Sequence, residues 1–168
     1  AKRLEECRLH QGTWDLLEWC AARGLRQSLL SATEQGQLED AVADFGLTEL
    51  FEHVIGQSNC HAVGKAERAR ELVSSLDVDP EQVVLVGDTV HDAHVAERVG
   101  VVCVLVEGGH QHREKLDSAG VEVLDGLPVA GIPLGVNGVA PNTGLKPLTA
   151  KARGIKKQES DMADYSND

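Results

Sequence analysis

Apolar residues recur along the chain in two alternating patterns, one typical of helices and one typical of short strands. Stripes with helical spacing predict helices over residues 13–23, 34–45, 65–76, 92–99 and 111–119. Aliphatic runs between them predict strands over residues 25–30, 51–55, 83–86, 101–106 and 121–124. Strands that alternate with helices are typical of βαβ units, so we expect an α/β fold with a doubly wound, Rossmann-like parallel sheet.

The clearest strand covers residues 83–86, which are four consecutive aliphatic residues. The run follows Asp79-Pro80 and is ended by Gly87. An unbroken aliphatic run indicates burial on both faces, as in a parallel sheet covered by helices. We therefore expect this strand in the interior of the sheet.

Composition limits the class of protein and its partners. The chain has 168 residues, 42% of them hydrophobic, and a formal net charge of −11, so we expect one domain and neither nucleic acid nor an anionic membrane surface as a partner. No apolar stretch approaches the roughly 20 residues that cross a bilayer, and no signal-peptide pattern opens the chain. The cysteines form no C-x-x-C pair, which favours a cytoplasmic protein without a zinc or redox motif.

The two ends differ in character from the middle of the chain. Residues 129–168 are rich in Gly, Pro and Asn, then in Lys and Arg, and end acidic, with no periodicity. We expect a flexible tail there, after a core over residues 13–128. The start at Ala1, without Met and in a segment of helical character, favours an N-terminally incomplete piece of a longer protein.

Polar residues directly after two predicted strands are candidates for chemistry, because ligands of open α/β sheets bind beyond the carboxyl ends of the strands. The first strand leads into Ser31, and strand 83–86 leads into Asp88 and, four residues on, Asp92. Two such carboxylates raise each other's pKa unless a cation lies between them, and their oxygens suit Mg²⁺. The alternative for Asp92 is a purely structural role as the cap of the helix that follows.

Lys65 follows Gly64 at the start of a predicted helix, where a cation opposes the favourable sign of the helix dipole. A Lys in this position can hold a phosphate or balance carboxylates, whereas the alternative is a solvated surface side chain. The segment is not a P-loop, because Asn59 and Ala66 stand where that motif needs Gly and Ser or Thr. The sequence also lacks G-x-G-x-x-G, so we expect no dinucleotide cofactor.

Two pairs of histidines could also bind a metal. His91 and His94 lie near the candidate acids, and His110 and His112 lie after the next predicted strand. A transition-metal site needs a further soft ligand, which the nearby sequence does not offer. A place for His91 at the substrate entrance is more plausible than a metal site.

The order of a hydroxyl after a strand, Lys at a helix start and Gly-Asp-x-x-x-Asp after a strand resembles the haloacid dehalogenase-like superfamily, particularly its phosphoglycolate phosphatase-like branch. The resemblance covers about residues 16–127. It implies that Ser31 hydrogen-bonds the transferring phosphoryl group and that Lys65 stabilises the nucleophile and the phosphate. It also implies that Asp88 and Asp92 hold Mg²⁺. Two departures are Ala32, where many relatives have Asn, and Lys65-Ala66 in place of the common Lys-Pro.

The nucleophile motif of this family, D-x-D-x-[TV], is not found in the sequence. Its first Asp attacks phosphorus and its second acts as general acid and base. The single D-x-D, Asp77-Val78-Asp79, follows a helix and precedes a strand, which is the wrong place. The family's first strand is central and adjoins the strands that end at Ser31 and Asp88. We therefore expect a core without that strand, with unpaired backbone groups and an apolar slot.

The resemblance implies a Mg²⁺-dependent phosphatase that acts on a small phosphorylated metabolite such as phosphoglycolate, and that is inactive as this chain alone. Residues 1–12 are then the end of a cap domain or its return linker. The alternative is a non-catalytic, degenerate member that binds an anion or a protein partner. A receiver domain is disfavoured, because it would place its acids before its hydroxyl and Lys.

Overall fold

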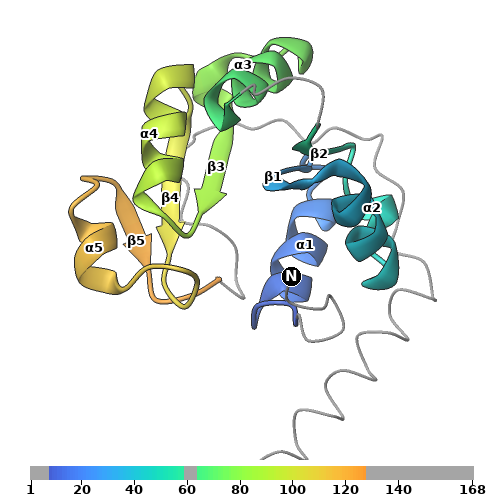
Figure 1. Cartoon of the computed structure of the whole chain (residues 1–168), viewed down its shortest axis with the longest axis horizontal. Coiled ribbons are helices and arrows are strands. Elements are labelled where there is room, and N and C mark those ends of the chain that lie inside the picture. Colours follow the sequence, from blue (N-terminus) through green and yellow to red (C-terminus); the bar gives the residue numbers. More distant parts are fainter. Residues whose placement is uncertain (1–7, 59–63, 128–168) are drawn as a thin grey trace, which may run out of the picture.

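Helices and strands alternate along residues 8–58 and 64–127, the part of the chain that the computed structural model describes (Figure 1). The helices are α1 (Thr13–Ala22), α2 (Gln35–Asp44), α3 (Lys65–Ser75), α4 (Val90–Val99) and α5 (Arg113–Asp117). The strands are β1 (Ser28–Glu34), β2 (His53–Gln57), β3 (Val84–Gly87), β4 (Val102–Val106) and β5 (Glu122–Leu124). Short 3-10 turns, Thr48–Leu50 and Pro80–Gln82, come shortly before β2 and β3. All the predicted helices and strands are therefore present, with shifted ends.

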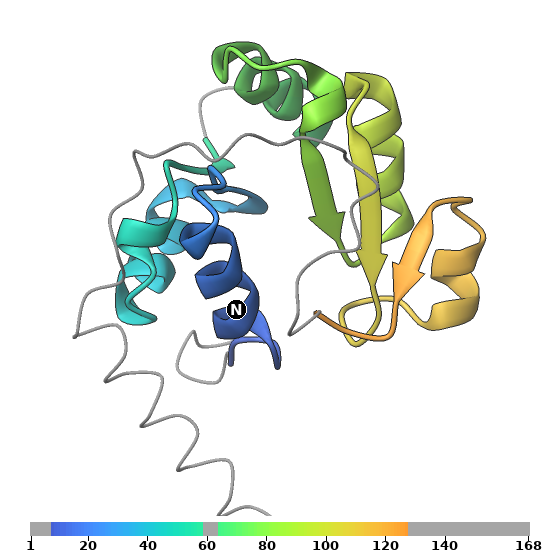
Figure 2. The same ribbon diagram turned by 180° about the vertical axis from the view of Figure 1, so that it is seen from behind.

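The strands form two parallel sheets, one of β1 and β2 and the other in the order β3-β4-β5. In the first sheet Leu29 is opposite Val54, and in the second Leu85 is opposite Cys103. Parallel neighbours need a crossover, which α2, α4 and α5 provide. The α/β class and the parallel pairing are confirmed, but within the described ranges the strands form two sheets instead of one (Figures 1 and 2).

Each sheet has its own hydrophobic core. In the first, Trp14 and Leu17 of α1 pack against Val42 of α2 and against side chains around the first 3-10 turn. In the second, Leu105 of β4 and Leu116 of α5 are both 0% exposed. Full burial of one such side chain stabilises a fold by about 1.5–3 kcal/mol. The two halves of the described chain thus bury separate sets of side chains.

A cavity of about 700 Å³ lies between the two sheets, lined by β1, β3, α1 and α3. Val84, Leu85 and Val86 of β3 line this cavity and are only half-buried. The prediction that residues 83–86 are buried on both faces is therefore wrong for the described chain, because β3 is an edge strand. The cavity lies where the apolar slot was predicted, between the strand that carries Ser31 and the strand that leads into Asp88.

The start of α4 also differs from prediction. Helix α4 begins at Val90, with Thr89 as its N-cap, so Asp92 is not the capping residue itself. Helix α1 begins at Thr13 as predicted, and its N-cap Gly12 has a positive φ of 83°. A Cβ at Gly12 would lie 2.8 Å from the carbonyl oxygen of Leu127, so the backbone makes a close approach there.

Some predictions concern residues outside the described ranges. The flexible tail over 129–168 and most of the segment 1–12 lie there, as do Cys7 and Cys60. Cys20 and Cys103 are free thiols, and burial raises the pKa of each to about 11. In the part of the chain that the structure describes, every helix is too short or too polar to cross a membrane.

Candidate functional site

Asp92 is buried at the amino end of α4, just after β3. Its side chain is 4% exposed, and its Oδ2 accepts a hydrogen bond from Thr89 Oγ1 at 2.8 Å. The same oxygen accepts from the backbone N–H groups of Asp88 and Thr89 at 3.2 Å each. Thr89 Oγ1 accepts from the Asp92 backbone N–H, which completes a capping box. Asp92 therefore contributes to the start of α4, as the structural alternative supposed, and keeps Oδ1 for another partner.

The partner of Asp92 Oδ1 is Lys65, the first residue of α3. Lys65 Nζ donates a hydrogen bond to this oxygen at 2.6 Å. The Lys65 side chain is only 20% exposed, which excludes the alternative of a solvated surface Lys. Removing two charges from water is costly, and a buried ion pair offsets this cost only if its geometry is good and its remaining polar atoms form hydrogen bonds. The pair joins two helices that pack against each other, α3 and α4.

Asp88 directly follows β3 and is held by the loop after β4. Its Oδ2 accepts a hydrogen bond from the His110 backbone N–H at 2.9 Å, and His110 Nδ1 lies 2.6 Å from the same oxygen. Burial alone raises the pKa of the Asp88 carboxyl, but the hydrogen bonds and charge of His110 outweigh it, so the pKa lies below its usual value. Asp88 is therefore a carboxylate at neutral pH.

Two glycines make room for these carboxylates. A Cβ at Gly87 would lie 2.4 Å from Asp92 Cβ, and a Cβ at Gly109 would lie 2.2 Å from Asp88 Oδ2. Neither distance is tolerable without movement of the acid. The glycine before Asp88 in the sequence is thus needed for close packing of Asp92 against the end of β3.

Ser31 lies in the other sheet, in an irregular part of β1. The pairing with β2 shifts register between Leu30 and Glu34, so residues 31–33 form a bulge. Ser31 Oγ donates to Thr33 Oγ1 at 3.0 Å and accepts from the Thr33 backbone N–H at 3.1 Å. The predicted strand end at Leu30 is therefore wrong, and the Ser31 hydroxyl is oriented by its own bulge.

Arg68 connects Ser31 to the helix that carries Lys65. Its Nη1 donates to the carbonyl oxygen of Ser31 at 2.9 Å and to the carbonyl oxygen of Gly56 in β2. Its Nε is buried without a hydrogen-bond partner in the described part of the chain. Helix α3 therefore carries one cation that faces Asp92 and a second that holds both strands of the first sheet.

The structure brings Lys65, Asp88 and Asp92 together at the carboxyl end of β3. Lys65 contacts Asp92, and Asp92 accepts from the Asp88 backbone. Ser31 is tied to α3 through Arg68 but has no hydrogen bond to the carboxylates in the described ranges. The chemical roles given to these four residues remain predictions.

Sequence reasoning missed Arg68 altogether and missed the role of His110. Arg68 carries no signal in a single sequence, because its partners are backbone carbonyls of distant strands. His110 was considered only as a metal ligand. Its place in the loop after β4 could have indicated its contact with Asp88, because residues after neighbouring strands meet at one edge of the sheet. His91, which was considered for the substrate entrance, is exposed.

The donors at this site fit a hard divalent cation in part. Mg²⁺ takes one or two carboxylates and keeps several waters. Asp88 Oδ1 makes no hydrogen bond within the described ranges and is half-buried, so it is available as a ligand. Asp92 Oδ1 would have to be shared with Lys65 or released by it. The described residues contain no group of three or more His, Cys, Asp or Glu side chains that could hold a metal ion.

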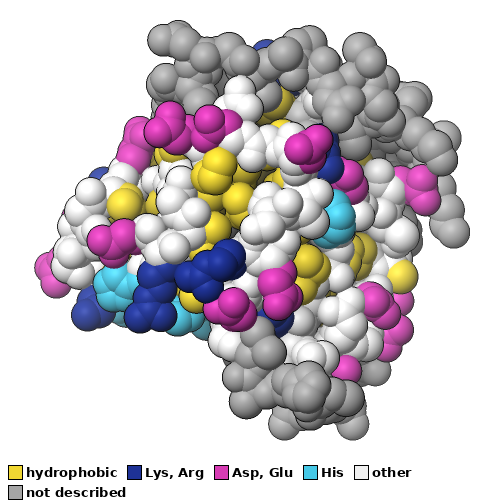
Figure 3. Space-filling model, turned by 90° about the horizontal axis from the view of Figure 1, so that it is seen from above, with side chains coloured by type: hydrophobic (Ala, Val, Ile, Leu, Met, Phe, Trp, Pro, Cys, Tyr) yellow, Lys and Arg dark blue, Asp and Glu magenta, His cyan; other side chains and the backbone are white. Residues whose placement is uncertain are grey.

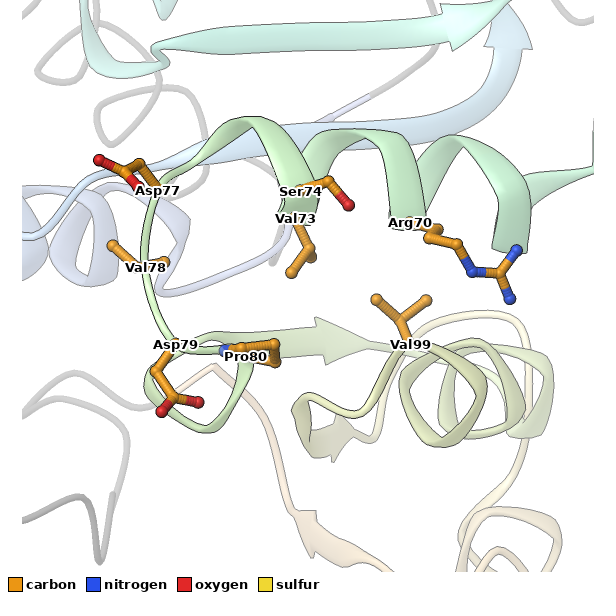
Figure 4. Close-up of a pocket in the computed structure, with 8 residues that line it drawn as sticks. All are labelled: Arg70, Val73, Ser74, Asp77, Val78, Asp79, Pro80 and Val99. Atoms are coloured by element: carbon orange, nitrogen blue, oxygen red, sulfur yellow. The ribbon is translucent and has the colours of Figure 1, made fainter.

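A second hollow lies at the opposite end of β3 and does not contain the candidate site. It has a volume of about 560 Å³ and lies between α3, α4 and the loop before β3. Val73 and Val99 point toward each other there, with Arg70 at one end and Asp77 and Asp79 at the other (Figure 4). Asp79 caps the 3-10 turn by accepting from the Glu81 backbone N–H at 3.1 Å. The single D-x-D of the sequence therefore lies at the amino end of β3. A nucleophile would have to lie at the opposite, carboxyl end, beside the candidate site.

Comparisons with known proteins identify the family of the chain. The family model of haloacid dehalogenase-like hydrolases matches residues 1–106. The chain is 30% identical over 122 residues to a phosphoglycolate phosphatase of Synechococcus elongatus, covering 70% of this chain and 57% of the relative. It is 28% identical over 129 residues to a phosphoglycolate phosphatase of Rhodospirillum rubrum, covering 76% and 53%.

Solved structures show the same fold. A haloacid dehalogenase-like family hydrolase of Streptococcus pneumoniae matches with a TM-score of 0.66 and 20% identity, covering 73% of this chain and 57% of that one. The CbbY protein of Rhodobacter sphaeroides, in complex with phosphate, matches with a TM-score of 0.63 and 25% identity, covering 77% and 60%. The chain thus spans 53% to 60% of the length of these relatives. Because the family model covers well over half of the sequence, the chain belongs to the haloacid dehalogenase-like hydrolase family.

Proposed function

We propose that this chain provides the phosphate- and magnesium-binding part of a phosphatase that hydrolyses a small phosphate monoester such as phosphoglycolate. The observation that carries the proposal is the buried contact between Lys65 and Asp92, next to the carboxylate of Asp88. Together, the ammonium group of Lys65 and the two carboxylates at the carboxyl end of β3 can bind both an anion and a metal ion. The two curated relatives described above are phosphoglycolate phosphatases, which supports this substrate class.

Each site residue has a distinct task in this proposal. Asp88 and Asp92 hold Mg²⁺, which supplies positive charge to the phosphoryl oxygens when bound. Lys65 moves its hydrogen bond from Asp92 to the phosphate, so the pair seen here is the resting arrangement. The Ser31 hydroxyl turns from Thr33 to donate to the phosphoryl group. Binding and charge neutralisation of this kind supply most of the catalysis of phosphoryl transfer.

The nucleophile does not come from these 168 residues. The sequence has no D-x-D-x-[TV], and Asp77 and Asp79 lie at the wrong end of β3. We therefore propose that the chain alone does not turn over phosphate esters. A carboxylate from further polypeptide would have to meet Lys65 and Asp88 for the reaction to occur.

The setting we propose is cytoplasmic, with a small metabolite as partner and neither nucleic acid nor membrane. The net charge of −11 disfavours polyanions. On the face seen in Figure 3, Lys and Arg side chains gather in one cluster beside a hydrophobic band, with Asp and Glu around it. On this face, the basic side chains therefore do not form a continuous basic track.

Calorimetric titration of the full chain with MgCl₂ tests the binding part of the proposal. We expect saturable binding that Asp88→Asn and Asp92→Asn each weaken at least tenfold. Asp79→Asn is the matched control, because it changes a carboxylate at the other end of β3 and Asn can still cap the 3-10 turn. Equal weakening by all three variants, or no binding at all, would refute a magnesium site here.

An assay with p-nitrophenyl phosphate and phosphoglycolate tests the catalytic part. The chain alone should give no turnover above that of the Asp88→Asn variant. Mg²⁺-dependent turnover by the unaltered chain would show that a nucleophile is present after all.

The second candidate is a non-catalytic module that binds an anion or a protein. The observation in its favour is that the sequence contains no nucleophile motif. It predicts that phosphate binds without Mg²⁺ and that Asp88→Asn leaves this binding unchanged. The phosphatase proposal predicts that Mg²⁺ strengthens phosphate binding and that Asp88→Asn removes the effect.

A further inference from the structure

The hollow at the amino end of β3 is lined by aliphatic side chains. It lies between α3, α4 and the loop before β3, has a volume of about 560 Å³, and is called the α3–α4 hollow below. Val73, Val78 and Val99 line it (Figure 4). Val78 is 38% exposed and is one of two large hydrophobic residues exposed to this extent in the described chain. An apolar surface rimmed by polar side chains is typical of an interaction site.

The charges at the rim of the α3–α4 hollow are separated by sign. Arg70 lies at one end, whereas Asp77 and Asp79 lie at the other (Figure 4). Arg70 and Asp77 are seven positions apart, about two helical turns, so both lie on the side of α3 that faces the hollow. At a rise of about 1.5 Å per residue, the two charged ends are about 10 Å apart. A ligand that spans the hollow therefore meets a positive charge at one end and negative charges at the other.

The side chains at both ends can accept a new partner. Arg70 Nη1 lies 2.6 Å from Glu67 Oε2, but both side chains are about half exposed, and exposed pairs of this kind contribute little to stability. Asp79 uses Oδ1 to cap the 3-10 turn, and its Oδ2 makes no hydrogen bond within the described ranges. Ser74, between the two ends along α3, is exposed in the hollow and offers a hydroxyl to a bound backbone. Binding in the hollow therefore breaks no strong interaction.

The dimensions of the hollow fit a short extended segment. An extended chain advances about 3.3 Å per residue, so about three residues cover the distance between the charged ends. The rise along a strand, the spacing between strands and the spacing between packed layers give about 160 Å³ per residue, so the hollow holds about three to four residues. A helix needs about seven residues to cover the same distance, which is twice what the hollow holds. The occupant is therefore extended, with its middle residues in the hollow and the flanking residues at the rim.

The alternation of side chains determines which residues of such a segment face the protein. In an extended chain, residues i, i+2 and i+4 lie on the same side. A central aliphatic residue would contact the valines, and the residues two positions before and after it would lie at the charged ends. Charge complementarity requires one of these to be basic, near Asp77 and Asp79, and the other to be acidic, near Arg70. The matching pattern is basic-x-aliphatic-x-acidic, in either chain direction.

We propose that the α3–α4 hollow binds an extended segment of a partner protein with the pattern basic-x-aliphatic-x-acidic. Its basic side chain pairs with Asp77 and Asp79, its aliphatic side chain packs among the valines, and its acidic side chain pairs with Arg70. The inference goes beyond the proposed function and does not depend on it, because the hollow lies at the opposite end of β3 from the candidate site.

The probe is the acetylated and amidated peptide Lys-Thr-Val-Thr-Glu, titrated into the nitrogen-15-labelled full chain at low salt and followed by NMR. We expect saturable one-to-one binding, with shifts of the backbone amides of residues 73–79 and of Val99. Binding should weaken as NaCl is added, because exposed charges are screened.

The control peptide is Thr-Lys-Val-Glu-Thr, which has the same composition and the same central Val. Its charged residues are only two positions apart and lie on the opposite side of the chain from that Val. They cannot reach both ends of the hollow while the Val contacts the valines. The control peptide should therefore bind at least threefold more weakly.

A charge exchange tests the role of Arg70. Arg70→Glu should weaken binding of Lys-Thr-Val-Thr-Glu at least fivefold and strengthen binding of Lys-Thr-Val-Thr-Lys at least fivefold. Lys115→Glu is the matched control, because it makes the same change in net charge at an exposed position of α5, outside the hollow. It should leave both affinities within twofold.

A pair of valine variants tests the apolar contact. Val78→Ser removes two methyl groups from the hollow and should weaken binding of Lys-Thr-Val-Thr-Glu at least threefold. Val102 is the other exposed large hydrophobic residue and does not line the hollow. Val102→Ser should therefore leave the affinity within twofold.

Several results would overturn the proposal. Equal affinity for the two peptides of identical composition would show that the spacing of the charges does not matter. Equal effects of Arg70→Glu and Lys115→Glu, or shifts confined to other residues, would place the binding elsewhere. A dimer in sedimentation, with concentration-dependent shifts of the same amides, would show that a second copy of the chain occupies the hollow. Should circular dichroism show that a variant is unfolded, the two peptides still test the unaltered protein. Loss of Mg²⁺ binding in the earlier titration would leave these results unaffected.

Discussion

Lys65 Nζ lies 2.6 Å from Asp92 Oδ1, and this contact joins the start of α3 to the start of α4. The two residues are 27 positions apart in the sequence. Because Asp92 Oδ2 is fully engaged by the turn before α4, Lys65 is the partner that balances the charge of a nearly buried carboxylate. A single side chain therefore links the stability of the fold to the candidate site.

Replacement of Lys65 by Met leaves the Asp92 carboxylate buried without its cation. We expect a loss of about 3 kcal/mol in the free energy of unfolding, measured by urea denaturation followed by circular dichroism. Lys115→Met, at an exposed position of α5, is the control and should change the value by less than about 0.5 kcal/mol. The double variant Lys65→Met/Asp92→Asn should regain part of the loss. If it is no more stable than the single variant, the uncompensated charge is not the cause.

Removal of the His110 side chain should change the titration of Asp88. A carboxyl whose pKa is lowered by folding contributes stability above its unfolded pKa of about 3.9, and that stability is lost as the pH falls through the folded value. In His110→Ala the backbone N–H still donates but the ring does not, so we expect the pKa of Asp88 to rise. Carbon-13 NMR of the side-chain carboxyl measures the pKa directly.

The matched control for that titration is His112→Ala. His112 is exposed and makes no side-chain cap to α5, so the pKa of Asp88 should stay unchanged. Unfolding measured from pH 7 down to pH 3 should show a smaller acid-dependent loss for His110→Ala than for the unaltered protein. An identical Asp88 titration in both variants would mean that His110 does not stabilise the carboxylate.

Gly109→Ala should displace the Asp88 carboxylate. The new Cβ would lie 2.2 Å from Asp88 Oδ2, so the acid or the loop after β4 must move. We expect a loss of about 1–3 kcal/mol in stability, with weaker Mg²⁺ binding in calorimetry. Gly126→Ala is the control, since a Cβ there meets nothing within 4 Å. Unaltered Mg²⁺ affinity in Gly109→Ala would show that the position of Asp88 is not critical for the metal.

Local pattern was enough to predict much of the fold and part of the site. The helical stripe over residues 65–76 and the strand signals on either side gave the correct element order. The rule that ligands bind beyond the carboxyl ends of strands then led to Asp88 and Asp92. Lys65 begins a helix, where the helix dipole disfavours a positive charge, and this position indicated that its charge has a partner. That partner is now seen to be Asp92.

The rest depends on contacts between distant segments, which one sequence does not reveal. Whether residues 83–86 are buried depends on which strands flank them, and in the described chain one side of β3 faces a cavity. The bulge at Ser31 follows from pairing with β2 and from Arg68, neither of which leaves a local trace. The capping box of Asp92 was visible only as a general preference of Asp for helix starts.

Arg68→Lys tests whether the guanidinium positions the Ser31 bulge. One nitrogen of Arg68 bonds the carbonyl oxygens of Ser31 and Gly56, and the rest of the planar group fills the buried space between α3 and the first sheet. A flexible ammonium keeps the charge but does not reproduce this planar shape. We expect a loss of about 1.5–3 kcal/mol and faster amide exchange at Leu30 and Ile55, measured by mass spectrometry.

Arg70→Lys is the control on the same helix. Arg70 is exposed and pairs only with Glu67 within the described chain, so exchange in β1 and β2 should not change. If the two variants exchange alike, the strands hold their register without Arg68. If Arg68→Lys alone loosens the bulge, then α3 carries both the cation that faces Asp92 and the cation that supports Ser31. A shift of α3 would then move both halves of the candidate site together.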